Sequence, residues 1–200
     1  MNILKSAFTV ALLGFSAISF AATNVALNAP VSLSGTFGTG DTPVWCCGSL
    51  AGASTLTDNV FLTPSTQWNV GTVFWNGFQN RGNTIQIDLG GQFSISSLTL
   101  QADNNDIYPV FYRNGSADPW QSVWNALSVG GSGMQTRVSD PLSIVATSFL
   151  IGNGNGDGYY SVSEFQAFGA PVPEPETYAM MLIGLGLVGF ITRRRNNGQS

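Results

Sequence analysis

The segment QADNNDIY, residues 101–108, places four polar side chains that can form hydrogen bonds within four consecutive positions. Asp103 and Asp106 supply carboxylates, and the two asparagines between them supply amides. Ionised carboxylates accept hydrogen bonds, whereas amides both accept and donate them, so the group can bind the hydroxyls of a sugar. A polar turn between two strands explains the same residues without any ligand, and both interpretations remain open.

A sugar site of this kind also needs an aromatic side chain whose face packs against the C–H groups of the sugar ring. We consider Trp45, Trp120 and Trp124 as candidate platforms, because Trp68 and Trp75 are expected in the core. The alternative is that all of these tryptophans are buried in the fold. The predicted ligand residues are therefore Trp45, Trp120, Asp103 and Asp106.

Catalysis finds little support in the sequence. There is no histidine, and no nucleophile paired with a base, no phosphate-binding loop and no metal-hydrolase spacing. A glycosidase needs only two carboxyl groups about 5–10 Å apart, a separation that a sequence does not show. We expect a binding protein and not an enzyme, with no catalytic residues.

The two cysteines, Cys46 and Cys47, are adjacent. Neighbouring Cα atoms are about 3.8 Å apart, which is below the usual separation for a disulfide. The pair can be structural, can form a strained disulfide that stiffens a loop beside Trp45, or can bond to another molecule. It provides no disulfide framework for the fold.

Charge excludes one class of partner. Residues 23–170 contain nine acidic residues and only three basic ones, all arginines, for a net charge of −6. Nucleic-acid binding requires clustered Lys and Arg to neutralise phosphates. We therefore expect no nucleic-acid partner.

The N-terminus predicts export. Lys5 precedes an apolar run of residues 7–20, and small residues at Ser19 and Ala21 lie before Ala22. This is the pattern of a cleaved secretory signal peptide at residues 1–22, and the run is shorter than the roughly 20 residues that span a bilayer.

The centre of the chain has the alternation of β-strands. Ile85, Ile87 and Leu89 alternate with polar residues, and the alternation changes phase at Ser96–Ser97, which predicts a bulge. Gly- and Asn-rich turns separate the strands, and no long amphipathic helix is expected. The pattern predicts an all-β antiparallel sandwich or jelly roll. The predicted strand residues are 70–75, a run over 83–90 that continues over 91–101, 108–113, 142–151 and 159–168.

Four motifs occur in the same order as in a known family. They are NVALNAPVSLSG after the signal peptide, LTDNV…TQW at 56–68, IQIDLGGQFSISSLTL at 85–100, and GDGYYSVSEFQAFG at the end of the domain. Together they resemble the discoidin, or coagulation factor 5/8 type C, family, which shares its galactose-binding-like fold with family 32 carbohydrate-binding modules. The resemblance covers residues 23–170. It implies an eight-stranded jelly roll whose loops at one end bind ligands.

The same resemblance implies a structural Ca²⁺ ion. Carried over to this chain, its ligands are Asp58 and Glu164, with Thr66 as a further oxygen donor; alternatively, Asp58 caps a turn and Glu164 lies on the surface. One departure concerns the penultimate strand, where Ala146–Phe149 replaces the Arg-Tyr pair that the family often has. Any role of that arginine in binding is therefore in doubt here.

The C-terminus combines Pro173-Glu174-Pro175, an apolar segment at 178–192 and the cluster Arg193-Arg194-Arg195. As a helix, 15 residues extend about 22 Å, a marginal span with positive charge at its cytoplasmic end. The three parts resemble the PEP-CTERM sorting signal of Gram-negative bacteria that make exopolysaccharide, a signal thought to be processed by the membrane protease exosortase. A permanent membrane anchor is the alternative.

These features predict five segments. They are the signal peptide 1–22, the domain 23–170, the linker with the sorting motif 171–177, the transmembrane helix 178–192 and the basic cytoplasmic tail 193–200. We expect an exported protein that is held in the inner membrane during sorting and then reaches the cell surface or matrix, where its domain binds carbohydrate, in particular exopolysaccharide. The alternative is a structural matrix or adhesion protein that binds another protein or no specific ligand.

Overall fold

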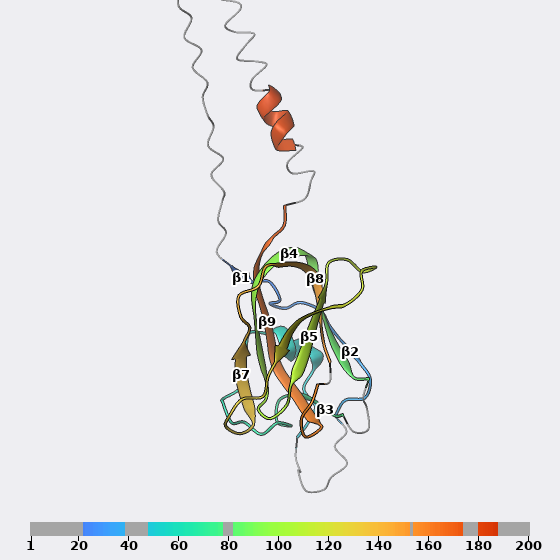
Figure 1. Cartoon of the computed structure of the whole chain (residues 1–200), viewed down its shortest axis with the longest axis vertical. Coiled ribbons are helices and arrows are strands. Elements are labelled where there is room, and N and C mark those ends of the chain that lie inside the picture. Colours follow the sequence, from blue (N-terminus) through green and yellow to red (C-terminus); the bar gives the residue numbers. More distant parts are fainter. Residues whose placement is uncertain (1–21, 39–47, 78–81, 153, 174–179, 188–200) are drawn as a thin grey trace, which may run out of the picture.

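The computed structural model describes residues 22–38, 48–77, 82–152, 154–173 and 180–187. Over these residues the chain forms antiparallel strands, one short 3-10 helix, η1, at Ala53–Thr57, and a helix at residues 180–187 (Figure 1). The strands are β1 Thr23–Asn24, β2 Val31–Ser34, β3 Val73–Asn76, β4 Thr84–Asp103, β5 Tyr108–Arg113, β6 Gln121–Ala126, β7 Met134–Val138, β8 Ile144–Ile151 and β9 Tyr159–Pro171. The predicted all-β jelly roll is confirmed, with nine strands described where the resemblance implied eight.

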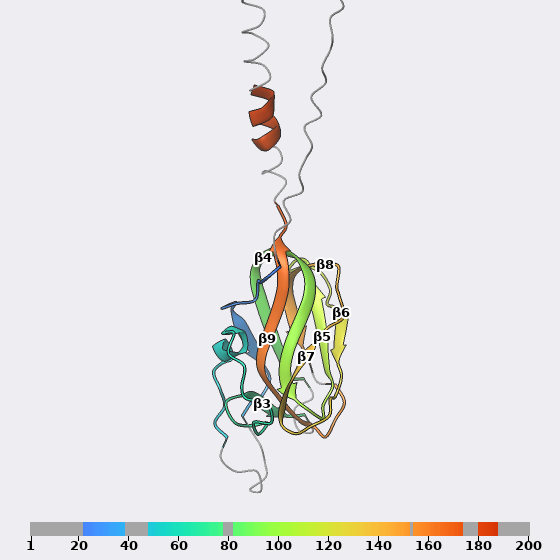
Figure 2. The ribbon, with the colours of Figure 1, turned by 90° about the vertical axis from the view of Figure 1, so that its left-hand side faces the viewer.

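Strand β4 joins the two layers of the sandwich. Its first part pairs with β2 and β8, and its second part pairs with β9 and β7. Figure 2 shows β8, β5 and β6 to one side of β4 and β9. The two predicted runs at 83–90 and 91–101 form one strand, because β4 continues through an irregularity between Asp88 and Phe93. Gly90 permits it with a φ of +70°, and its N–H donates to Asp88 Oδ1 over 3.0 Å.

The bulge predicted at Ser96–Ser97 is present. The pairing between β4 and β9 shifts register between Ile95 and Ser97. Ile95 and Leu98 are both buried, at 1% and 0% exposure. Without the shift, a separation of three positions would place these two side chains on opposite faces, since side chains alternate along a strand.

The core lies between the layers and is rich in aromatic rings. Trp75 stacks on Tyr160 with ring centroids 5.4 Å apart, and Phe149 packs against Phe165 at 5.3 Å. Trp75 is 1% exposed, which confirms its predicted place in the core. Burial of each such side chain stabilises the fold by about 1.5–3 kcal/mol.

Both ends of the domain emerge at the same end of the sandwich (Figure 1). Thr23 of β1 pairs with Gly169, near the end of β9. β9 has 13 residues, and at about 3.3 Å per residue it extends about 40 Å. The loop before Tyr159, where β9 begins, is thus at the opposite end from the point where the C-terminal tail leaves the domain.

Residues 180–187 form a helix with exposed apolar side chains, among them Met180, Leu182 and Leu187 at 68, 65 and 59% exposure. Within the described part of the chain, none of the helices has the length and apolar character needed to cross a bilayer. The predicted helix at 178–192 extends beyond these residues, and the signal peptide and the basic tail lie almost wholly outside the described ranges. Both membrane-related predictions remain predictions.

Candidate functional site: a cavity at the loop end of the sandwich

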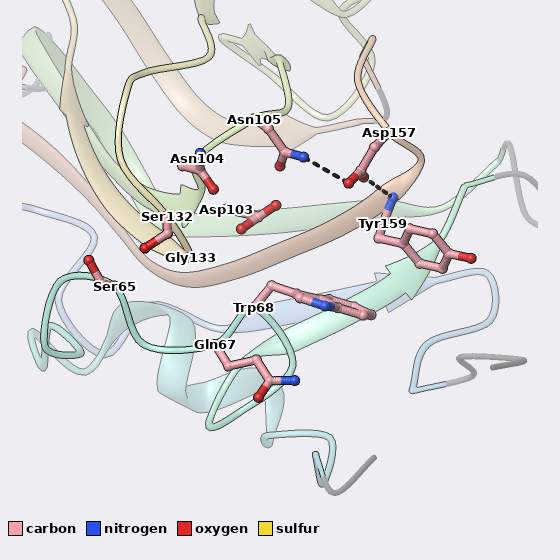
Figure 3. A pocket seen from close by; sticks show the side chains of 10 residues that line it. All are labelled: Ser65, Gln67, Trp68, Asp103, Asn104, Asn105, Ser132, Gly133, Asp157 and Tyr159. Atoms are coloured by element: carbon pink, nitrogen blue, oxygen red, sulfur yellow. Dashed lines mark hydrogen bonds between the residues drawn. The ribbon is translucent and has the colours of Figure 1, made fainter. Parts of the chain in front are cut away.

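Loops at the end of the sandwich opposite the termini enclose a cavity of about 470 Å³, here called the loop-end cavity (Figure 3). The loops lie at 58–72 before β3, 104–107 after β4, 127–133 before β7 and 152–158 before β9. The lining residues are Ser65, Gln67, Trp68, Asp103, Asn104, Asn105, Ser132, Gly133, Asp157 and Tyr159. The volume falls within the usual range for small-molecule sites, about 300–1,000 Å³.

Two glycines allow the loops to approach one another closely. Gly133 has a φ of +58°, and a Cβ there would overlap the carbonyl oxygen of Thr66. A Cβ at Gly156 would overlap the carboxylate of Asp106. These contacts require glycine and fix the relative positions of the loops around the cavity.

One wall of the cavity is aromatic. The rings of Trp68 and Tyr159 are 5.6 Å apart with planes inclined by 47°. Trp68 also packs edge-on against Phe74, at 5.3 Å and 88°. The prediction that Trp68 belongs to the core was wrong in this respect: the side chain is only half-buried and lines the cavity, although its packing holds it in place.

Asp157 connects the loops by hydrogen bonds. Its carboxylate accepts one bond from Asn105 Nδ2 at 2.7 Å and another from the Tyr159 N–H at 2.9 Å (Figure 3). Its own N–H donates to Asp106 Oδ1 at 3.0 Å. Polar and aromatic residues of the cavity are thereby fixed as one unit.

Asp103 and Asp106, both predicted as ligand residues, occupy different places. Asp103 lines the cavity and is 5% exposed, whereas Asp106 is fully buried behind the lining residues. Burial raises the pKa of Asp103 to about 6 and that of Asp106 to about 7, and the negative charge of Asp157 adds to both shifts. Oδ2 of Asp106 is buried without a hydrogen-bond partner.

Arg137 holds the segment that carries these carboxylates. Its side chain is 5% exposed and donates to the backbone carbonyls of Leu127 at 2.7 Å, Ala102 at 3.1 Å and Asp106 at 3.4 Å. A further short bond goes from Nη2 to the carbonyl of Asp103. A single buried guanidinium thus fixes both ends of the turn between β4 and β5 to the loop before β7.

The loop that carries Trp68 is fixed at two points. The side-chain amide of Gln101 accepts from the Leu62 N–H at 2.7 Å and donates to the Leu62 carbonyl at 2.9 Å. Further along, the N–H of Met134 donates to the carbonyl of Thr66 at 2.8 Å. The aromatic wall therefore depends on contacts with β4 and β7.

The predicted calcium ligands Asp58 and Glu164 lie close together at the start of this loop. Glu164 is 0% exposed, Oε1 accepts from the Asn59 N–H at 3.2 Å, and Oε2 is buried without a partner. Burial raises the pKa of Glu164 to about 7; the Gln166 side chain offsets part of this shift, and the charge of Asp58 adds to it. The alternative was right that Asp58 caps a turn, since its Oδ1 accepts from the Val60 N–H at 2.8 Å, and wrong in placing Glu164 on the surface.

These residues fit a cation, because a bound ion would supply the partner that the buried oxygen lacks. In the described ranges no three Asp, Glu, Cys or His side chains gather into a metal-binding cluster. A cation here would have two carboxylate ligands, with carbonyl or water oxygens completing the six to eight that Ca²⁺ takes. Thr66 is engaged elsewhere: its hydroxyl donates to the Thr63 carbonyl at 2.7 Å, and its carbonyl is bonded to Met134.

The other predicted residues do not line the loop-end cavity. Trp120 lies next to Gln121, which pairs with Tyr112 near the opposite end of β5. The guanidinium of Arg113 packs over the Trp120 ring, 4.5 Å from its centroid. Trp124, on strand β6, borders a separate groove of about 460 Å³.

Several predicted residues lie outside the described ranges. They are Trp45, Cys46, Cys47, Glu174, Pro175, Arg193, Arg194 and Arg195. Of the predicted sorting motif only Pro173 is described, after the end of β9.

Trp68, Tyr159 and Asp157 are among the cavity residues that the sequence analysis did not assign to a site. The sequence held one usable signal. Trp68 lies between Gln67 and Asn69 in a stretch without strand alternation, a context more typical of a loop than of the core.

The sandwich has the fold of family 32 carbohydrate-binding modules, the discoidin-like jelly roll. One similar structure is a selenomethionine-labelled mutant of chitosan-binding module 1 from a chitosanase/glucanase of Paenibacillus sp. IK-5. It is 21% identical, with a TM-score of 0.50 over 74% of this chain and 99% of that one. Another is the family 32 module of C. perfringens NanJ in complex with galactose, 17% identical, with a TM-score of 0.50 over 74% and 98% of the two chains.

The tail supplies the second part of the identification. Residues 171–195 match the PEP-CTERM protein-sorting motif. The chain therefore joins a domain with the fold of family 32 carbohydrate-binding modules to a PEP-CTERM sorting signal, as the motifs of the sequence had indicated. No curated protein matches the sequence.

Proposed function

We propose that this protein is exported, sorted through its PEP-CTERM tail, and binds carbohydrate in the loop-end cavity. Its ligand in the cell is an exopolysaccharide at the surface or in the matrix. The domain acts as a binding module and performs no catalysis.

The observation that carries this proposal is the composition of the cavity. An aromatic wall made by Trp68 and Tyr159 faces a polar group that includes Asp103 and Asn105. A sugar ring has the matching character, with apolar C–H faces and hydroxyls at its edge. Rigid aromatic side chains bind such a face at a low cost in conformational entropy.

The similar structures support this class of ligand. One is named as a chitosan-binding module and the other was solved with galactose. The identities are low, so they support the fold and leave the sugar to be determined by the residues of this chain.

The position of the cavity suits a protein anchored at its C-terminus. The tail leaves the sandwich at the end opposite the loops, about 40 Å away along β9 by the 3.3 Å rise per residue. A domain held at the inner membrane during sorting would direct its loops away from the bilayer. After cleavage near Pro173 by an exosortase-type protease, the same surface would be free to bind polysaccharide.

We also propose that Ca²⁺ binds Asp58 and Glu164 as a structural ion. It would neutralise two neighbouring carboxylates and fix the beginning of the loop that leads to Trp68. The orphaned Oε2 of Glu164 supports this assignment.

A glycan array tests the proposed function. The purified full-length protein, kept soluble in a detergent without a sugar headgroup, should bind a defined set of glycans. Trp68→Ala should lose this binding, because the face of the aromatic wall is removed, whereas Trp120→Ala at the other end should keep it. Thermal melting of both variants establishes that they are folded. Binding that survives Trp68→Ala in a folded protein, or no binding to any glycan, would contradict the proposal.

A further inference from the structure

The loop-end cavity is strongly acidic. Asp103 and Asp157 both line it, and Asp106 lies behind them with one carboxylate oxygen buried and unpartnered. Asp103 is itself 95% buried, since its exposure is 5%. When ionised, these groups place three negative charges at one end of the domain.

Among the described residues, Arg137 supplies the positive charge at this end, and it partly offsets the raised pKa of Asp103. Arg137 is near, but its N–H groups donate to backbone carbonyls, including those of Leu127 and Ala102. Its guanidinium therefore fixes the backbone and is not directed at a ligand. Arg113 is at the opposite end of β5, over Trp120. Arg81, the third arginine of the domain, lies outside the described ranges.

The aromatic wall faces the same carboxylates. Trp68 stands across the cavity from Asp103, and Tyr159 is bonded through its N–H to Asp157 (Figure 3). A cation between these groups would contact carboxylate oxygens on one side and the face of an aromatic ring on the other. Both contacts are attractive for an ammonium group.

We propose that the sugar bound in the loop-end cavity carries a free amine, and that Asp103 and Asp157 bind its ammonium group while Trp68 packs on the sugar ring. This inference rests on the proposed carbohydrate-binding function and specifies its ligand class.

The charge of the cavity decides between three kinds of sugar. A uronic acid, sulfated or phosphorylated sugar would bring a further negative charge to carboxylates beside which the described residues place no free cation. A neutral sugar can donate hydroxyl hydrogen bonds but leaves the carboxylate charges unbalanced in a partly desolvated site. An amino sugar donates N–H bonds and balances charge as well. Burial raises the pKa of Asp103 to about 6 and the charge of Asp157 adds to this shift, so a bound ammonium group would favour the ionised carboxylate.

The test uses oligosaccharides in pairs that differ only at the amine. One pair is a β-1,4-linked glucosamine tetrasaccharide and its fully N-acetylated counterpart; the other is galactosamine and N-acetylgalactosamine. A neutral hexose oligosaccharide and a uronic-acid oligosaccharide complete the set. Isothermal titration of the full-length protein in a sugar-free detergent at pH 7 gives each Kd. We expect the free amine to bind at least roughly tenfold more tightly than its acetylated partner, with a preference that weakens as salt is added.

Substitutions locate the effect. Asp103→Asn should reduce amine binding to the level of the acetylated sugar. Asp157→Asn should also weaken amine binding. Because Asp157 is exposed, this variant should fold and can be used for the test if Asp103→Asn does not fold. The matched control is Asp118→Asn, which removes an exposed carboxylate from the loop between β5 and β6. Equal losses in all three variants would show that the amine is attracted by net charge only, and would overturn the inference.

The remaining outcomes separate the two proposals. If the N-acetylated or neutral sugars bind as tightly as the amines, or the acidic oligosaccharide binds best, the amine inference is overturned and the carbohydrate-binding function stands. If none of the sugars binds, both are overturned.

Discussion

The proposed Ca²⁺ site predicts that the free energy of unfolding depends strongly on pH when Ca²⁺ is withheld, and that Glu164 is the cause. The pKa of Glu164 in the ion-free fold is about 7, against an ordinary value of 4.5. A folded-state pKa above the unfolded one means that the fold binds the proton more tightly. The ion-free protein should therefore lose stability as the pH rises from about 4.5 to about 7.

The size of this loss follows from the shift. A difference of about 2.5 pKa units corresponds to about 3 kcal/mol, because each unit is worth 1.36 kcal/mol. This is the cost of keeping an ionised, fully buried carboxylate beside Asp58. A bound Ca²⁺ would remove most of that cost, so its effect should be large at pH 8 and small at pH 5. Ligand binding adds about 2.7 kcal/mol at a hundredfold excess over Kd.

Urea unfolding in EDTA and in Ca²⁺, at pH 5 and pH 8, measures these differences. Glu164→Gln keeps an oxygen that can accept from the Asn59 N–H but cannot ionise. In EDTA at pH 8 this variant should be more stable than the unaltered protein, by up to about 3 kcal/mol. It should also lose the response to Ca²⁺. The control Asp118→Asn removes an exposed carboxylate and should leave both behaviours unchanged.

The free energy of unfolding should change with pH by different amounts in the unaltered protein and in Glu164→Gln. This difference isolates the contribution of Glu164 from that of the other carboxylates. Identical unfolding curves in EDTA and Ca²⁺ at pH 8 would refute the ion site. Identical pH slopes in the two proteins would refute the assigned role of Glu164.

Three further predictions concern other parts of the chain. Arg137→Met should destabilise the fold by about 3 kcal/mol or more in urea unfolding, because it leaves several buried carbonyls without donors; a loss below about 1 kcal/mol would contradict the role assigned to the guanidinium. Asp106→Asn should stabilise the protein at pH 8 but not at pH 4, because burial raises the pKa of Asp106 from 3.8 to about 7. Equal changes in the free energy of unfolding at both pH values would contradict this prediction. Glu174→Ala combined with Pro175→Ala should leave the protein uncut in the inner membrane; mass spectrometry that finds an intact arginine-containing tail on the unaltered surface protein would indicate a permanent anchor.

The sequence predicted β5, β8 and β9 best, because each contains a run of β-branched and aromatic residues next to a Gly- or Asn-rich turn. Tyr108–Arg113 has the predicted bounds, and β8 and β9 differ only at their ends. The phase change at Ser96–Ser97 was a reliable sign of a bulge because one extra residue restores the buried face.

Strands β6 and β7 could not be predicted from alternation. β6 is at the edge of the sheet order, and most of its residues are exposed or half-buried. In β7 the two buried side chains are Met134 and Arg137. A charged residue in a sequence is normally expected on the surface, because Arg is rarely buried without partners. Arg137 is buried because backbone carbonyls around it accept its hydrogen bonds.

The site was predicted in part. The polar turn that contains Asp103 does border the cavity, and the aromatic residue beside it is Trp68; Trp120 and Trp124 do not line the cavity, and the prediction for Trp45 lies outside the described residues. Trp68 is brought to Asp103 by contacts such as that between Thr66 and Met134, which are distant in sequence. Contacts between distant segments therefore decide which tryptophan lines the cavity, and the local sequence pattern does not predict it.

The indole N–H signals of the tryptophans test the central claim most directly. The chain has five tryptophans, each with one indole N–H that ¹⁵N-resolved NMR can follow and a Trp→Phe substitution can assign. On titration with an oligosaccharide that the protein binds, the signal of Trp68 should shift most, while those of Trp75 in the core and Trp120 at the far end should stay in place. A sugar that binds and shifts the signal of Trp120 or Trp124 but leaves Trp68 unchanged would contradict the account.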